Sequence, residues 1–579
     1  MLKRTGSILG KAIAGFLSIV ILALIGTGAM LSRGPVSLAP LAPYLEKFMD
    51  NPSWRFRVRF DDAVLSWEGW RKKLDLRVIG VRFMDRNGVE LISVPRMSVV
   101  FDGRALLAGQ FRVSGLELIA PKLRLLRHGD GRIEIANNDG AAGSGERTGL
   151  TFAPALLAAG GRGGAYGIFG DLRSLSVLGA DLSFHDMSSG LKLAVPAADL
   201  SLRQETDGVS MRLSTRLRIG QSEAALGISA LYRDEATAII AAVNFAEVDI
   251  AGLAKAIGGT RLETMRGLAV VAAGRLDLAL SPNGIIDSLS FEVTTGPGRI
   301  ALPRPEDKAV TIAALSAKGQ FSNNFSQLKL SSLHLDLGAG LTAQATGQWA
   351  RSEGGGEGGG TFKGKGTLVN LPVAKLPLYW PENLAVEVRN WILKNIHGGL
   401  VTEGRFAIDL RPGDLDRETP RPGMARLDWT FQDVSADYFG ELPPIKGASG
   451  SGFIDGLEFG LTVTDATAGG MKLSEGKLHV ADLTVQPPIL DIEFVAHGPI
   501  GDALALLDAK PLQFTTALAL RAEDAEGQSA TRARLRVPLS EDVTLEQVGF
   551  SAAANIAELS LRGIPGGYRV RDGAFTLTV

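Results

Sequence analysis

The feature that most constrains the fold is an alternation of apolar and polar residues with a period of two, which dominates the sequence from about Trp54 onward. Such a period predicts strands with one apolar and one wetted face. Turn clusters such as DRNG at 85–88 separate the runs. We expect antiparallel meanders, because parallel strands need crossover connections, usually helices, that the sequence scarcely contains. One of the clearest runs comprises Leu457, Phe459, Leu461 and Val463.

Composition narrows the classes of function. The chain has 579 residues, 61 basic and 62 acidic side chains, and no cysteine. Balanced charge gives no support to nucleic-acid binding, which leaves a basic excess or a basic stripe. The lack of cysteine excludes disulfides, thiolate metal sites and cysteine nucleophiles. Six scattered histidines form no ligand pair at metal-site spacing, so we expect no metal and no cofactor.

The N-terminus carries a membrane signal. Residues 12–31 (AIAGFLSIVILALIGTGAML) are uncharged and match the ~20 residues that cross a bilayer core as a helix. Lys3, Arg4 and Lys11 precede this span, which favours a cytoplasmic tail at 1–11 and the bulk of the chain on the far side. A cleaved signal peptide is the competing interpretation. We predict a retained, single-pass transmembrane helix.

One internal segment has the periodicity of a helix. In the stretch LPLYWPENLAVEVRNWILKNIHGGLVTEGRF (376–406), Pro381 suits a first helical position, and Gly398 with Gly399 suits a helix end. The sequence therefore predicts a helix at about 381–397. Its apolar stripe comprises Leu384, Val388, Trp391, Ile392 and Ile396.

Two glycine-rich segments divide the predicted strands into blocks. Residues 137–149 and 351–360 have too little apolar content to pack. The segments 137–164 and 351–360 are therefore predicted to be loops, either within one sheet or between domains. The expected regions are 32–136, a β-rich repeat region at 165–350, and a further β region at 361–579. A weak internal echo, FAEVDIAGLA at 245 and FQDVSADYF at 431, favours a repeated structural unit.

Short motifs that resemble catalytic or nucleotide-binding sites lack the surrounding secondary structure that such sites need. GGGEGG at 354 and GGTFKGKG at 359 resemble nucleotide-binding loops, but no strand-to-helix transition surrounds them. No G-x-S-x-G elbow occurs. We therefore predict that the protein is not an enzyme.

The helical segment, followed by LDWTFQDVSADYFGELPPIKGASGSGFIDGLEFGLTVTDATAGGMKLSEGKLHVADL, resembles the central region of YhdP-like members of the AsmA-like superfamily. The resemblance is specific over about 365–510. It implies a mainly β protein, anchored in the inner membrane of a Gram-negative cell, whose long twisted antiparallel sheet curls into an elongated apolar groove with few short helices. Such a groove would carry phospholipid acyl chains across the periplasm toward the outer membrane.

Within this resemblance, the residues expected to line the groove are Phe406, Ile408, Leu410, Leu457, Phe459, Leu461 and Val463. The helix at 381–397 is expected to cover one section of the groove as a lid, or to pack as an ordinary core helix. Two alternatives stay open. In one, the sheet closes on a second sheet as a sandwich. In the other, the protein is a non-enzymatic scaffold for outer-membrane protein assembly or envelope integrity, with envelope proteins as partners.

Overall fold

In the computed structural model, contacts divide the chain into two compact units, Met1–Val293 and Thr294–Val579, which we describe separately. Apart from a few isolated residues, the structure describes residues 34–38, 57–67, 74–84, 90–102, 112–128, 133–136, 172–187, 192–206, 208–219, 222–233, 239–257, 263–281, 286–301, 309–352, 359–380, 386–414, 419–438, 441–510, 521–540, 545–562 and 569–578.

The described residues of the first unit form mainly strands, together with two short helices. Its elements are β1 (Val36–Ser37), β2 (Arg57–Arg59), β3 (Asp62–Trp67), β4 (Leu74–Met84), β5 (Glu90–Phe101), β6 (Val113–Ile119), β7 (Lys122–Arg127), β8 (Ile133–Ala136), β9 (Ser174–Asp186), β10 (Lys192–Glu205), β11 (Gly208–Ile219), β12 (Ser222–Arg233), β13 (Ile239–Asp249), α5 (Ile250–Ile257), α6 (Glu263–Arg266), β14 (Leu268–Ala269) and β15 (Val271–Leu280). The next strand, β16 (Ile286–Thr295), spans the boundary between the units.

The later strands of the first unit form a meander, whereas β1 pairs with β3, β2 with β4 and β5 with β7. Strands β9 to β13 and then β15 pair in sequence order and antiparallel, as the alternation predicts. The exception is β9, which pairs in parallel with β6 and β7. The chain between β7 and β9 is long enough to make the crossover that parallel pairing needs. A compact core around Val81 and Val94 lies between β2 and β6.

The described residues of the second unit also form mainly strands. Its elements are β17 (Gly298–Ala301), β18 (Ala309–Ile312), β19 (Ala314–Ser322), β20 (Gln327–Asp336), β21 (Thr342–Arg351), β22 (Gly360–Pro372), η5 (Val373–Lys375), α7 (Leu376–Tyr379), α8 (Val386–Asn395), β23 (Ile396–His397), β24 (Leu400–Leu410), β25 (Ala425–Ala436), β26 (Ile445–Asp455), β27 (Glu458–Ala468), β28 (Met471–Val480), β29 (Ile489–Pro499), α9 (Ile500–Asp508), η7 (Ala522–Asp524), β30 (Ala525–Pro538), η8 (Leu545–Gln547), β31 (Gly549–Leu561) and β32 (Val570–Thr578).

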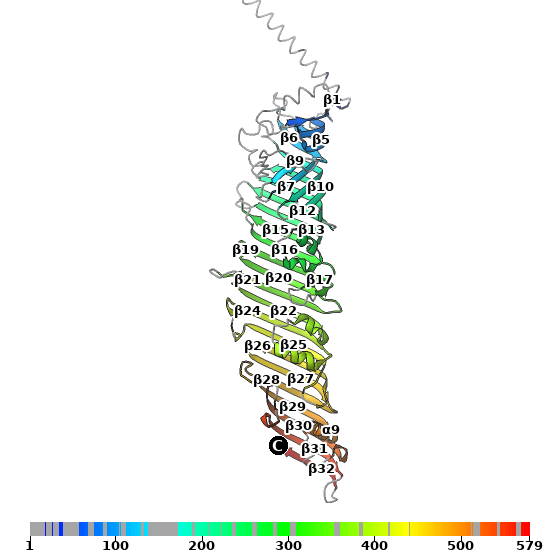
Figure 1. Ribbon diagram of the computed structural model, residues 1–579, viewed down its shortest axis with the longest axis vertical. Coiled ribbons are helices and arrows are strands. Elements are labelled where there is room, and N and C mark those ends of the chain that lie inside the picture. Colours follow the sequence, from blue (N-terminus) through cyan, green and yellow to red (C-terminus); the bar gives the residue numbers. More distant parts are fainter. Residues whose placement is uncertain are drawn as a thin grey trace, which may run out of the picture. The chain divides into compact units, whose positions relative to one another are not determined.

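From β19 to β32 the second unit is one antiparallel sheet in which the long strands pair in sequence order (Figure 1). This confirms the prediction of a mainly β fold with a long antiparallel sheet and few short helices. Because successive strands run in opposite directions, α8 after β22 and α9 after β29 lie at the same margin of the sheet (Figure 1). Shorter connections join the strands at the other margin.

Several residues near strand ends and in a hairpin turn adopt positive φ angles. The β27–β28 hairpin turns on Gly469 and Gly470, both with positive φ, which is the combination that tight hairpins require. Near the ends of β13, β22, β25 and β31 a single polar residue adopts positive φ: Glu247, Asn370, Asp433 and Glu558. In β13 and β25 these residues lie in the FAEV and FQDV segments of the sequence echo, and the strand pairing shifts register there. The echo therefore corresponds to a repeated strand irregularity.

Three sequence predictions concern the segments between strands. The predicted transmembrane segment 12–31 lies outside the described residues except for Ser18, Gly26 and Met30, and no described helix is long and apolar enough to cross a membrane. Segment 137–164 also lies outside the described residues. Segment 351–360 connects β21 to β22, which pair with each other up to Arg351 and Gly360.

Candidate functional site

An uninterrupted apolar lane crosses the second unit. In antiparallel sheets, directly opposed residues have side chains on the same face, so the register can be followed from strand to strand. From β19 to β31 it joins twelve residues without one polar side chain. We call these residues the central lane: Leu315, Leu335, Ala343, Leu368, Gly404, Trp429, Gly452, Leu461, Leu478, Ile492, Leu535 and Phe550.

Six of the predicted groove residues lie on the face that carries this lane. Leu461 belongs to the lane itself. Phe406 and Phe459 lie in an adjacent apolar row that runs through Leu427 and Ile454. Ile408 and Leu410 follow Phe406 at every second position of β24, and Val463 lies opposite Gly450. Leu457 differs, because it occupies the turn before β27 rather than the strand.

The large side chains of the lane are not enclosed. Only its glycines, Gly404 and Gly452, are buried, whereas its leucines, isoleucine and tryptophan are partly exposed and Phe550 is 55% exposed. Nearby, Phe431 is 7% exposed and forms a small cluster with Ala448 and Ala466. The described part of this face therefore has local packing around Phe431 without a continuous buried layer of large side chains.

The opposite face of the same strands is charged and self-paired. Arg426 donates hydrogen bonds to Asp428 at 2.7 and 2.8 Å and to Asp455 at 2.9 Å. The hydrogen bond from Arg426 holds the pKa of Asp428 below its ordinary value. Further pairs across neighbouring strands join His479 to Glu458 and Lys363 to Asp409. We call this surface the polar face. The sheet thus separates an apolar side from a charged side on which several charges form ion pairs.

Aromatic side chains on the apolar face lie over glycines of neighbouring strands. Trp429 lies over Gly452, Phe431 over Gly450 and Phe406 over Gly366, so close that a Cβ atom on the glycine would overlap or crowd the ring. Trp429 and Phe459 also pack together, with ring centroids 6.2 Å apart. Glycine permits such close approach because it has no side chain.

The predicted lid helix ends earlier than expected, and the described part of its apolar stripe is only partly buried. α8 ends at Asn395, and Ile396 with His397 forms β23, which pairs with β25. His397 meets Asp437 at 2.9 Å instead of closing a helix. Ile392 and Ile396 are partly buried, but Trp391 is 50% exposed. Leu384 and the side chain of Val388 lie outside the described residues.

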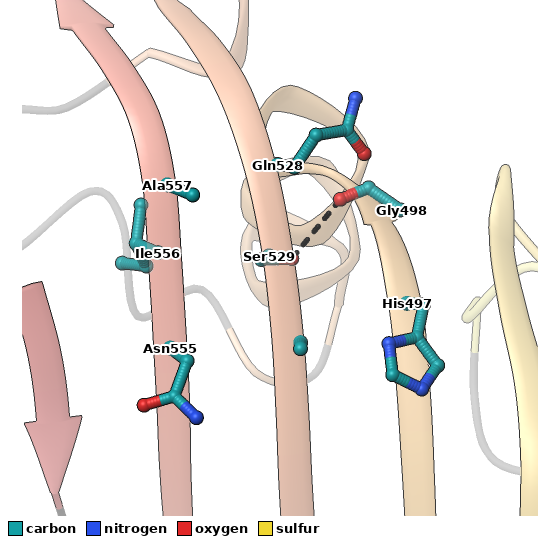
Figure 2. Close-up of a pocket in the computed structure, with 8 residues that line it drawn as sticks. His497, Gly498, Gln528, Ser529, Asn555, Ile556 and Ala557 are labelled. Carbon is teal, nitrogen blue, oxygen red and sulfur yellow. Dashed lines mark hydrogen bonds between the residues drawn. The ribbon is translucent and has the colours of Figure 1, made fainter. Parts of the chain in front are cut away.

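A shallow pocket of about 280 Å³ lies on β29, β30 and β31 (Figure 2). His497, Ala530 and Asn555, which are opposed on the polar face, form part of its lining. Its one drawn hydrogen bond runs from the Ser529 hydroxyl to the Gly498 carbonyl oxygen at 3.2 Å. Among the described residues no group of three or more metal-ligating side chains gathers, there or elsewhere. The pocket shows no catalytic arrangement.

Sequence reasoning did not identify Trp429, Phe431, Gly404 or Gly452 as parts of the site. The run LDWTF shows the alternation that places Trp429 and Phe431 on one face, so a signal existed. The glycines gave no such signal, because a glycine in a strand pattern also suggests a bulge or a turn. Only the register between strands shows what lies opposite them.

The fold and the site define a class: a β-sheet protein with a long apolar face and a charged, self-paired opposite face. The comparison with known families agrees with the sequence resemblance. Residues 287–563 match the family described as "YhdP protein" and belong to that family, which confirms the YhdP-like, AsmA-superfamily assignment. The match covers nearly all of the second unit and extends beyond the 365–510 region of specific resemblance. No curated protein and no solved structure matches the chain.

Proposed function

We propose that this protein is an inner-membrane-anchored periplasmic bridge that binds phospholipid acyl chains on the apolar face and conducts them between the inner and outer membranes. The central lane carries the proposal, because it offers twelve consecutive strands of apolar contact. The YhdP family suggests an envelope protein and is not a known enzyme family, which supports a role without chemistry.

The length of the lane favours conduction over the binding of one lipid. Strands in a sheet lie about 4.8 Å apart, so twelve strands give roughly 50 Å of apolar path. One leaflet of a bilayer supplies about half of the ~30 Å hydrocarbon core, or about 15 Å of acyl chain. The lane is therefore several acyl chains long, whereas a site for a single lipid needs only a fraction of it.

The exposure of the lane favours an open groove over a closed sandwich. Side chains between two packed sheets interdigitate and form a buried core. Along the central lane only the glycines are buried. Large exposed apolar surfaces on a folded protein mark sites for lipid or protein partners. On the polar face, charges such as those of Arg426, Asp428 and Asp455 pair with one another, so we place the cargo on the apolar face.

A charge introduced into the lane tests this proposal. Leu461→Asp should accumulate to near-normal level, since the carboxylate in an open groove stays hydrated and the backbone pairing of β27 remains. The variant should nevertheless fail to complement loss of the wild-type gene, because a passing acyl chain must desolvate the charge. The matched control is Thr462→Asp, which adds the same charge one residue away on the polar face, opposite Lys477. The control should complement.

A photocrosslinking residue gives the direct measurement. At Leu461 it should capture phospholipid, identified by mass spectrometry of the adduct, and at Thr462 it should not. Collapse of Leu461→Asp together with no lipid adduct at Leu461 would favour the sandwich. A stable outer-membrane protein adduct without lipid would favour an envelope scaffold.

A further inference from the structure

We propose that Gly452 is a positioning residue: it allows the Trp429 indole to lie flat across β26, and the flat ring keeps the central lane open to a passing acyl chain. This inference rests on the function proposed above, and it assigns a specific role within that function to a glycine and a ring. The observation that carries it is the contact between the two residues across β25 and β26.

Trp429 and Gly452 are directly opposed in the pairing of β25 with β26. The place that a Cβ atom of Gly452 would take is occupied by the benzo part of the Trp429 indole, and the Cδ1 atom of Leu461 lies 3.0 Å from it. All three nearest atoms belong to side chains. The largest side chain of the lane therefore rests on a position of β26 from which no side chain projects toward it.

Two related ring–glycine contacts lie nearby, one on the same two strands and one between β24 and β22. The Cζ atom of Phe431 lies 3.0 Å from the place of a Cβ on Gly450, and that of Phe406 lies 2.6 Å from the place of one on Gly366. At these two glycines a backbone oxygen of the next strand also crowds that place, whereas at Gly452 side chains alone do so. Three neighbouring aromatic residues thus each lie over a cross-strand glycine. Rings that lie along the sheet cover its backbone with apolar surface but add little height, whereas rings that stand up from the sheet obstruct the space above it.

A methyl group at Gly452 is incompatible with this ring position. Because side chains occupy discrete rotamers, the indole has to leave for another well, and the space away from the sheet is the lane. Gly404 provides a matched control, since it is opposed to Trp429 from the other side, on β24. A Cβ atom there meets nothing closer than Leu368, at 4.0 Å. Gly404→Ala therefore adds the same methyl to the same lane without moving the ring.

The experiment compares lipid capture on the two sides of the ring in the full-length protein. Photocrosslinking residues are placed singly at Leu368 on β22 and at Ile492 on β29, both in the central lane. In Gly452→Ala, phospholipid capture should fall several-fold at one of the two positions and persist at the other, because the path is blocked between them. Gly404→Ala should match wild type at both. Adding Trp429→Ala to Gly452→Ala should restore capture, because the obstructing ring is gone.

Two results overturn the inference while leaving the proposed function intact: wild-type capture on both sides in Gly452→Ala, or no rescue in the double variant. If Gly452→Ala fails to accumulate, the double variant still decides the question, since it lacks the clash and should fold and carry lipid. Failure of the double variant to accumulate would likewise refute the inference. Absence of lipid at Leu368 and Ile492 in the wild-type protein would instead count against the proposed function itself.

Discussion

At the scale of single residues, the backbone conformation near the strand ends restricts which residue types fit there, as side-chain packing does elsewhere. Asp433 has a φ of 53° between Gln432 and Val434 of β25, and the pairing with β26 shifts register there. Left-handed conformations disfavour most side chains, and asparagine, aspartate and glycine tolerate them best. The FQDV segment therefore combines an aspartate that accepts the irregularity with a valine that resumes packing against the Phe431 cluster.

This conformation makes a prediction about residue 433. Asp433→Val should destabilise the protein by about 1–2 kcal/mol, because a β-branched residue strains the left-handed backbone. Asp433→Gly should be tolerated. Urea unfolding followed by circular dichroism measures both, with Gln432→Val, an exposed neighbour in the same strand, as the control. An equal loss of stability in all three variants would show that the conformation of residue 433 is not the cause.

At the scale of elements, α8 is the helix that the sequence predicted, and its described C-terminal end differs from the prediction. Its C-terminal end was expected at the glycines 398–399, but the described helix ends at Asn395, and its expected start at Pro381 lies outside the described residues. The C-terminal part of the predicted stripe forms β23, because pairing with Ala436 and Ser435 of β25 is available to Ile396 and His397. Tertiary pairing outweighed local helical periodicity over these two residues.

The exposure of Trp391 determines how much stability the protein should lose when this side chain of α8 is truncated. Trp391→Ala should lower stability only slightly, since half of the side chain already contacts solvent. Phe431→Ala, at a site that is 7% exposed, should cost about 3–5 kcal/mol. Thermal unfolding of both variants checks this contrast. Altered lipid capture at Leu461 in Trp391→Ala without loss of stability would support a lid, and unchanged capture would remove that role from Trp391.

The class of fold could be predicted from sequence more fully than the site could. Period two is a local property, so the strands and the common face of Phe459, Leu461 and Val463 follow from it. The parallel pairing of β9 with β6 and β7 is a long-range property, and no local pattern announces it. The ring–glycine contacts of Trp429 and Phe431 depend on register between strands, which is fixed only when the whole sheet assembles.

At the scale of the whole molecule, acid should weaken the fold through its paired carboxylates. Hydrogen bonds from arginines lower the pKa of Glu223, Asp277 and Asp428. A carboxyl group whose pKa is lower in the folded state stabilises the protein above its unfolded pKa, and this contribution disappears as pH falls through the folded pKa. Ordinary values for Asp and Glu are about 4, so the loss begins near pH 4 and continues below it.

Calorimetry between pH 7 and pH 3 measures this effect. We expect a nearly constant unfolding temperature down to about pH 5 and a decline below about pH 4. Arg426→Gln should reduce the difference between neutral and acidic pH, because Asp428 then loses the partner that lowers its pKa. A protein that becomes more stable in acid, or an Arg426→Gln variant with an unaltered profile, would contradict this account of the polar face.

The order of pairing in the second unit also determines how such a protein can change its length. Each strand from β25 to β31 pairs with the strand before it and the strand after it in the chain. Removing two consecutive strands, for example β26 with β27, leaves β25 and β28 antiparallel and keeps their apolar sides together, whereas removing one strand leaves the remaining neighbours running in the same direction. Evolution can therefore lengthen or shorten this architecture by whole hairpins, and relatives whose sheets differ in length should differ by even numbers of strands.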